Sequence, residues 1–346
     1  MRRGLLAWSR DEVPPAALDA RIARCQAAMA EEGMDALVLY TSFPRPAAVS
    51  FLTHFVPYWN QGALVVLPDG APTLFVSLSK RVGGWIEETA YIAEVICTPR
   101  LGATIAGFLK ERLGAPKAIG VLELSRLPGG IAAPLAEGTA PAAPTDASAL
   151  FAAVRHPADE AELALSSHAD EMAERAFAGI GANGTSAPLV SSLDGTLRLH
   201  GAEEVLISIA PDLDRDIGLV RPDADIALGD RAAVQLSLAY KAHWIRVTHT
   251  LARDGIDGES HGAFRQALDG VRSAAGLREA LEGAVPDARL RSWSAEANRG
   301  SNPLALVAGE TNPRAAPPLG SVVSVTASYD GPEGPLLLGA PFVFGS

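Results

Sequence analysis

The residues with the clearest chemical potential lie in one stretch, residues 228–252. It carries a fixed positive charge at Arg246, an amide at Gln235, and two imidazoles at His243 and His249. A guanidinium can grip a carboxylate or a phosphate through two parallel hydrogen bonds. An imidazole can serve as an acid, a base or a metal ligand. No serine–histidine–aspartate or cysteine–histidine set has credible spacing for a nucleophilic mechanism, so the sequence favours anion binding over covalent catalysis.

Two strands of a hairpin are expected to hold these residues. Apolar residues alternate with polar or small ones through the first run, at Val234, Leu236 and Leu238. This period of two is typical of a half-buried strand. A second β-rich run, Trp244 to Leu251, follows after a break at 239–242. A turn centred on Tyr240-Lys241 would set Gln235 opposite Arg246, with polar side chains on one face.

The two histidines of the hairpin are the candidates for catalysis. Each lies an odd number of positions from Arg246, so both point to the opposite face of the strand if Arg246 faces a pocket. This placement favours a structural or interface role for His243 and His249 over an acid–base role.

The hairpin resembles the aminopeptidase P, methionine aminopeptidase and creatinase superfamily. The superfamily pattern is L-G-D-x-V-x-V-D-L-G-x-x-Y-x-G-Y-x-x-D-x-T-R-T, and the matching residues are Leu228-Gly229-Asp230, Tyr240, Thr248 and Thr250. The resemblance implies the "pita-bread" fold. In its metal-dependent members the two aspartates are ligands of a two-metal centre, and here those positions hold Gln235 and Arg246. An amide is a poor ligand and a guanidinium is none.

The other positions that the resemblance assigns to catalysis have also changed. Leu219 stands where the superfamily has a histidine, and Thr326 stands at a ligand glutamate. The region around 299–307 contains no histidine, and the run Leu337–Pro341 contains no carboxylate. The resemblance therefore implies a degenerate member with no metal and no cofactor, which is not a metallopeptidase.

The first part of the chain resembles the N-terminal domain of creatinase and aminopeptidase P. The resemblance lies in the run from Arg21 to Leu39 and in Phe51–Phe55. Helical patterns at 15–34, 78–89, 102–113 and 125–137 alternate with strand patterns at 36–41, 63–67, 73–76, 92–97 and 118–122. This alternation predicts a layered α/β domain.

An alanine- and proline-rich segment at 134–147 reads as the approach to a linker, and Val154–Leu165 resembles the superfamily's entry to the catalytic domain. We therefore expect a creatinase-type α/β domain at 1–147 and an α+β pita-bread domain at 148–346. In the second, helices are expected at 157–180, 186–199 and twice within 260–283. Strands are expected at 203–209, 288–294, 321–327 and 335–344, besides the hairpin.

Composition narrows the function classes. The chain of 346 residues has a formal net charge of −11 and no basic stripe, which argues against a nucleic-acid surface. No apolar run is long enough to span a membrane, and no signal peptide is evident. Cys25 and Cys97 are too few for a disulfide framework, so both are expected to be core thiols. We expect a cytoplasmic protein.

Arg246 is the central ligand-binding candidate. It could hold an anionic ligand, or it could neutralise a nearby acid in a filled pocket, such as Asp212, Asp214 or Asp216. Gln235, Thr326 and Ser301 could line the same cavity or simply fill it. In the superfamily, loops of the N-terminal domain reach the active site of the same or the neighbouring subunit. His54, Tyr58, Trp59 and Arg81 lie on such loops and suit a small polar ligand, although packing would equally explain the tryptophan.

Two functions from different classes follow. The first is a metal-independent protein, similar to creatinase and aminopeptidase P, that binds a small polar or anionic metabolite and could hydrolyse its C–N (amide) bond. Creatinase itself works without a metal. The second is a pseudoenzyme that acts as the partner subunit of an active paralogue or binds a peptide or metabolite, as a histone chaperone subunit with a dead peptidase-like domain does. The resemblance implies a homodimer or a heterodimer with a paralogue.

Overall fold

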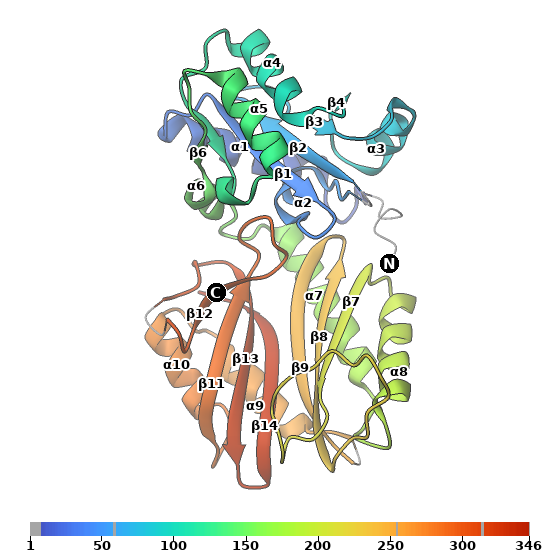
Figure 1. Cartoon of the computed structure of the whole chain (residues 1–346). Helices are drawn as coiled ribbons and strands as arrows, with labels where there is room; N and C mark the ends of the chain where they lie inside the picture. Colours follow the sequence, from blue (N-terminus) through green and yellow to red (C-terminus); the bar gives the residue numbers. More distant parts are fainter. Residues whose placement is uncertain (1–7, 58–59, 254, 313–314, 346) are drawn as a thin grey trace. The chain divides into compact units, whose positions relative to one another are not determined.

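The computed structural model describes residues 8–57, 60–253, 255–312 and 315–345. The chain forms two compact units (Figure 1). The first runs to Arg155 and includes Arg299–Pro303, and the second contains His156–Asn298 and the chain from Leu304 onward. Among the described residues, no helix combines the length and the apolar character that crossing a membrane requires.

The first unit is a six-stranded sheet with helices on both faces, which confirms the predicted α/β layering. The sheet order is β4-β3-β2-β1-β5-β6. The strands are β1 (Ala36–Ser42), β2 (Gln61–Val66), β3 (Thr73–Val76), β4 (Glu94–Cys97), β5 (Ile119–Val121) and β6 (Thr145–Asp146). The helices are α1 (Pro15–Glu31), α2 (Ala47–Thr53), α3 (Gly83–Thr89), α4 (Leu101–Leu113), α5 (Gly129–Thr139) and α6 (Ser148–Val154). One hydrophobic cluster joins the sheet to α1, α2 and α6, and another joins it to α4 and α5.

Helix α6 explains why the first unit extends past the predicted boundary at 147. Phe151 is fully buried in the cluster that also contains Leu37 and Leu39 of β1. Its ring meets the ring of Phe51 edge-on, with the centroids 6.2 Å apart. The alanine- and proline-rich stretch before it suggested a linker, but the buried phenylalanine holds the next helix on the first sheet.

The second unit is built on one antiparallel sheet of eight strands in the order β12-β11-β13-β14-β9-β8-β7, with β10 beside β9. The strands are β7 (Glu204–Ala210), β8 (Arg231–Tyr240), β9 (His243–Ala252), β10 (Gly255–Ile256), β11 (Arg289–Ala297), β12 (Ala305–Gly309), β13 (Val322–Gly331) and β14 (Gly334–Val343). The helices are α7 (Glu160–Phe177), α8 (Ser186–Leu199), α9 (Gly258–Leu268) and α10 (Ala274–Gly283). The expected helix at 157–180 begins at Glu160, because Asp159 caps it by accepting from the Glu162 amide at 2.9 Å.

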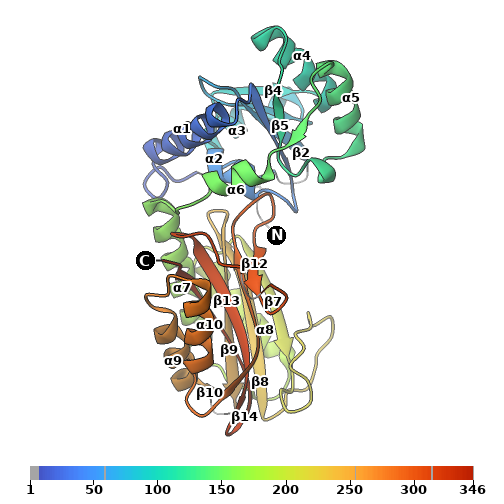
Figure 2. The same ribbon diagram turned by 90° about the vertical axis from the view of Figure 1, so that its left-hand side faces the viewer.

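All four helices of this unit cover the same face of the sheet, as the turned view in Figure 2 shows for α7, α9 and α10. One hydrophobic cluster joins α7 and α8 to β7, β8 and β9. A second joins α9 and α10 to β11, β13 and β14. The opposite face is partly covered at one end by the segment 211–227, where Leu213 packs on Ala233 and Leu337. We call it the open face.

The two halves of the sheet meet along β9 and β14 through one residue pair, Thr248 and Gly339. Side-chain hydroxyls supply the neighbouring hydrogen bonds. The Arg246 amide donates to Ser324 Oγ at 2.9 Å. Thr250 Oγ1 accepts from the Leu337 amide at 2.9 Å and donates to the Leu337 carbonyl at 3.0 Å. Hydroxyl groups therefore replace part of the backbone ladder at this joint.

The hairpin of β8 and β9 has a different register from the one predicted. Its turn consists of Lys241 and Ala242, which have φ angles of 48° and 63°. Gln235 therefore lies opposite Thr248, and Arg246 lies opposite Ser237. The predicted turn centre was wrong by one residue. A two-residue turn with two positive φ angles usually contains asparagine or glycine, and this turn contains neither.

This turn leads to a first prediction. Ala242→Gly should stabilise the chain by about 0.5–1 kcal/mol, because glycine adopts positive φ without the steric cost that alanine bears. Urea unfolding measures the difference. Ala164→Gly, at an exposed position within α7, is the matched control and should destabilise by a similar amount. Destabilisation by Ala242→Gly would contradict the turn geometry.

Candidate functional site

The open face of the second sheet carries a cluster of polar side chains. Strand alternation sets them on this face, away from the helix-covered hydrophobic clusters. We call this cluster the polar face, and its residues are Gln235, Ser237, Arg246, Thr248, Glu296, Ser324 and Thr326. It unites three residues that the sequence singled out, namely Gln235, Arg246 and Thr326.

One part of the polar face is neutral. Gln235 Nε2 donates to Thr248 Oγ1 at 3.2 Å and to Thr326 Oγ1 at 3.5 Å. The contacts link β8, β9 and β13, so residues that are 91 positions apart in the chain converge here. An amide and two hydroxyls offer both donors and acceptors to a polar ligand.

The charged part is an ion pair. The Arg246 guanidinium donates from Nε to Ser237 Oγ at 2.9 Å and from Nη1 to the Glu296 carboxylate. The two side chains keep 25% and 18% of their surface exposed, so solvent reaches both. The alternative in which Arg246 neutralises a nearby acid thus agrees with the structure, and the acid is Glu296 instead of one of the suggested Asp212, Asp214 and Asp216. Glu296 lies on β11, a strand that adjoins β13, and only the sheet order brings it to Arg246.

This donor set does not fit the two-metal centre that the superfamily resemblance implies. The two hairpin positions present an amide and a guanidinium, and Thr326 presents a hydroxyl. The carboxylate that faces them, Glu296, is already paired with Arg246. Leu219 packs among the apolar residues around Leu337. A guanidinium repels divalent cations and donates no lone pair, so we derive no metal-dependent step at this face.

The candidate residues near the N-terminus lie in the first unit. His54 is buried and ends α2 with a φ of 58°. Arg81 is exposed in a short 3-10 turn, Lys80–Val82. Ser301 is buried in the part of the chain that groups with this unit, where its carbonyl accepts from the Ala47 amide at 3.2 Å. Tyr58 and Trp59 lie outside the described residues.

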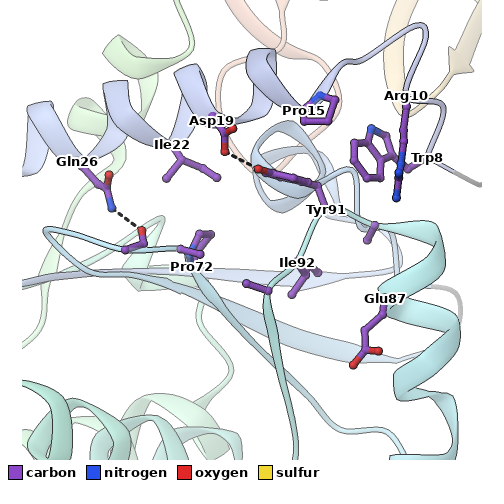
Figure 3. A pocket seen from close by; sticks show the side chains of 14 residues that line it. Trp8, Arg10, Pro15, Asp19, Ile22, Gln26, Pro72, Glu87, Tyr91 and Ile92 are labelled. Atoms are coloured by element: carbon purple, nitrogen blue, oxygen red, sulfur yellow. Dashed lines mark hydrogen bonds between the residues drawn. The ribbon is translucent and has the colours of Figure 1, made fainter.

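A cavity of about 550 Å³ opens in the first unit between α1 and the segment 87–93 (Figure 3). Trp8 and Tyr91 lie along it with ring centroids 5.2 Å apart. The Tyr91 hydroxyl donates to Asp19 at 2.5 Å, and this hydrogen bond raises the pKa of the tyrosine. Sequence patterns gave no signal for this cavity, because its walls come from three separate segments.

The two hairpin histidines lie on the helix-covered face, as their spacing predicted. His243 Nδ1 is 3.9 Å from the Glu162 carboxylate of α7. His249 is almost fully buried, and its Nε2 lies 3.2 Å from Glu174 Oε1. Neither points toward Arg246, so neither is placed to act on a ligand at the polar face.

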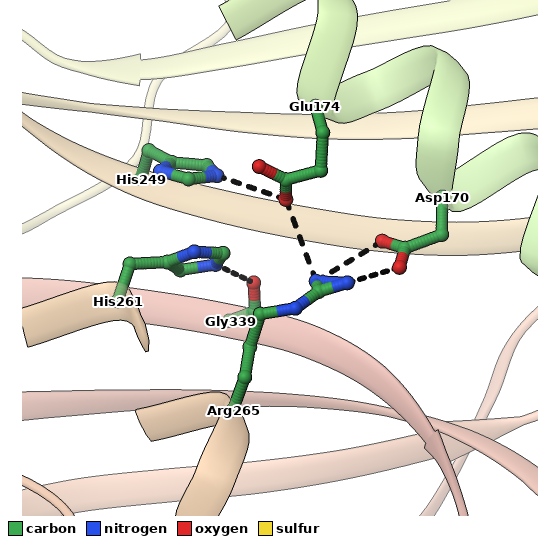
Figure 4. A network of polar contacts seen from close by, with 6 residues as sticks. All are labelled: Asp170, Glu174, His249, His261, Arg265 and Gly339. Carbon is green, nitrogen blue, oxygen red and sulfur yellow. Dashed lines mark hydrogen bonds and ion pairs between the residues drawn. The ribbon is translucent and has the colours of Figure 1, made fainter. Parts of the chain in front are cut away.

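His249 belongs to a buried polar cluster that the sequence did not reveal (Figure 4). Its ring stacks on that of His261 from α9, with centroids 3.6 Å apart. Arg265 donates to Asp170 and, at 3.4 Å, to Glu174. Burial and the neighbouring His249 lower the pKa of His261 to about 4, so its ring is neutral at physiological pH.

The comparisons with known proteins agree with this architecture. Residues 21–156 match the Creatinase/Prolidase N-terminal domain family. No curated protein matches the sequence. Among solved structures, the prolidase from Pyrococcus horikoshii superposes with a TM-score of 0.70 at 15% identity, covering 94% of this chain and 95% of that one.

Two further structures widen the comparison. The dipeptidase PepE from Mycobacterium ulcerans superposes with a TM-score of 0.63 at 18% identity, covering 95% of this chain and 93% of that one. The N-terminal domain of FACT complex subunit SPT16 from chickpea superposes with a TM-score of 0.58 at 11% identity, covering 94% and 93%. Residues 21–156 thus match a creatinase/prolidase N-terminal domain, and the fold of the whole chain is similar to that of the prolidase and dipeptidase structures.

Proposed function

We propose that this chain is a metal-independent binding protein of the pita-bread superfamily, and that its polar face holds a small ligand carrying a carboxylate. The observation that supports the proposal is the partly exposed ion pair of Arg246 and Glu296 within a set of neutral hydroxyl and amide groups. The side chains on this face are polar, whereas a site that binds nothing could fill with apolar side chains.

The chemistry of the pair favours a zwitterion. Arg246 keeps its charge at every physiological pH and has a planar fork that matches a carboxylate. Glu296 beside it would attract an ammonium group. A free amino acid or a short peptide carries both charges, and the dipeptidase and prolidase names of the structural relatives point to the same ligand class. Gln235 and Thr326 would hydrogen-bond the polar groups between them.

The expected test is a thermal-shift and calorimetry screen of amino acids, dipeptides and simple carboxylates. A ligand should bind the wild-type chain, and Arg246→Gln should weaken it by about 10- to 100-fold, the loss expected for a charge-assisted hydrogen bond. Arg246→Lys should recover only part of the affinity, since lysine keeps the charge and lacks the fork.

Arg289→Gln is the matched control, because Arg289 is exposed and pairs with Asp330 on the surface. Equal affinity in the Arg246→Gln and Arg289→Gln variants would overturn the proposal. Mass spectrometry of the recovered ligand separates binding from hydrolysis: we expect the ligand unchanged after prolonged incubation, and release of its two halves would show turnover.

The second candidate is a partner-subunit role. Its support is the structural likeness to the N-terminal domain of a protein that is named as a complex subunit. Sedimentation of the purified chain, with and without a paralogue from the same genome, tests it. A monomer mass at every concentration and in every mixture would exclude it.

A further inference from the structure

A cluster of metal-ligating side chains lies on the helix-covered face of the second sheet, away from the polar face. Glu174 extends from α7, His249 from β9 and His261 from the first part of α9 (Figure 4). Each of the three offers one ligand atom, and these atoms all lie within 4.8 Å of one another. Both histidines are buried, and Glu174 is about one-third exposed.

The separations are close to those of a coordinated ion. Zinc binds nitrogen and oxygen at about 2.0–2.1 Å, so neighbouring ligand atoms around a tetrahedral ion lie about 3.3 Å apart. His249 Nε2 and Glu174 Oε1 are 3.2 Å apart. The separations that involve His261 are at most 4.8 Å, so ion binding would require the His261 side chain to move closer to the other two ligands.

A hydrogen bond from one ring nitrogen of His261 would leave the lone pair of the other nitrogen available to bind an ion. Its Nε2 lies 3.3 Å from the carbonyl oxygen of Gly339, to which the protonated nitrogen can donate. Metal-binding histidines commonly make such a bond to a carbonyl with the nitrogen that faces away from the ion. With Nε2 donating, Nδ1 carries the lone pair of the neutral ring.

The charges of the cluster suit a divalent cation. Asp170 and Glu174 are two carboxylates, and Arg265 compensates one of them through its contacts to both. The two carboxylates and the guanidinium therefore sum to one net negative charge. Arg265 Nη1 contacts Glu174 Oε1, the oxygen that also faces His249, so an ion bound at Oε1 would displace this 3.4 Å contact while Arg265 keeps its pair with Asp170.

We propose that Glu174, His249 and His261 bind one divalent transition-metal ion of the zinc class. Two imidazoles and one carboxylate favour zinc, cobalt or nickel over magnesium and calcium, which prefer oxygen ligands. The ion links α7 and β9 of one half of the unit to α9 of the other half. Its role is structural, because the site is on the face opposite to Arg246.

The experiment uses the full chain, purified without a histidine tag and freed of metal with a chelator. Calorimetric titration with Zn²⁺ should show one ion per chain with a Kd of about 1 µM or below. His261→Gln and Glu174→Gln should each weaken binding by more than the roughly 10- to 100-fold that loss of an outer-shell partner causes. His200→Gln, at an exposed histidine of the same unit, should leave binding unchanged.

A spectroscopic readout on the wild-type chain keeps the test independent of how well the variants fold. Co²⁺ should give the visible absorption of a four-coordinate ion, and X-ray absorption of the zinc form should show two imidazole ligands. The absence of binding, unchanged affinity in the folded His261→Gln variant, or an ion without imidazole ligands would each overturn the proposal.

Discussion

Gly339→Ala is expected to destabilise the chain by about 3 kcal/mol, the upper end of the cost of overpacking a well-packed interior. A methyl group at this position would lie 2.8 Å from the Val325 carbonyl oxygen and 2.9 Å from Thr248 Oγ1. The Val325 carbonyl belongs to the backbone and cannot retreat as a flexible side chain can, and the β-branched Thr248 side chain is stiff. The glycine is therefore required by the close approach of β9, β13 and β14 at the joint of the sheet.

Chemical unfolding by urea measures the effect. Gly195→Ala is the matched control, because Gly195 lies within α8 and a methyl group there would meet no atom within 4 Å. That variant should be more stable than the wild type by up to about 1 kcal/mol. Equal stability of the two variants would show that the joint yields more easily than the structure implies.

Glu203→Gln is expected to remove a pH dependence of stability worth up to about 4 kcal/mol. Glu203 Oε1 accepts from the Lys241 amide at the hairpin turn, at 2.7 Å, while its other carboxyl oxygen is buried. Burial raises the pKa of this carboxyl to about 7. The unfolded chain would titrate it near its ordinary value of about 4.3.

The sign follows from the raised pKa. Below the unfolded pKa both states hold the proton and the stabilisation is complete. As the pH rises from about 4.3 to about 7, the unfolded state releases its proton first, so this group's contribution to the free energy of unfolding falls. Glutamine keeps the acceptor oxygen and never ionises.

Unfolding by urea at pH 5 and pH 8 tests this prediction. The wild type should lose more stability than Glu203→Gln between the two values, and the variant should be the more stable protein at pH 8. Exposed Glu279→Gln should follow the wild type. If the stability of the wild type and of Glu203→Gln depended on pH in the same way, the buried Glu203 carboxyl would not have a raised pKa.

The sequence predicted the architecture more accurately than it predicted the contacts between side chains. The alternation of Val234, Leu236 and Leu238 predicted that Gln235 faces away from the core. The odd spacing between Arg246 and His249 predicted that their side chains lie on opposite faces of the strand. Both inferences depend only on the geometry of a single strand. The matching N-terminal domain and the fold of the whole chain followed from motifs that are short and local.

What the sequence could not reveal depends on segments that are distant in the chain. Glu296 reaches Arg246 because β11, β13 and β9 come together in the sheet. His261 reaches His249 because α9 packs beneath the joint. The hairpin register failed for a local reason, since Lys241 and Ala242 adopt positive φ angles that neither residue type favours.

The joint between the halves of the second sheet has a consequence for motion. Each half has its own helices and its own hydrophobic cluster. The backbone ladder at the joint is one residue pair long, and the Arg246 and Leu337 amides donate to hydroxyls that can exchange partners with water. We therefore expect local opening of the second sheet to begin at this joint. Opening there would change the spacing between Gln235 and Thr326 on one face and between His249 and His261 on the other. Hydrogen exchange should detect this opening: the Arg246 and Leu337 amide hydrogens should exchange faster than amide hydrogens in the interior of either half of the sheet.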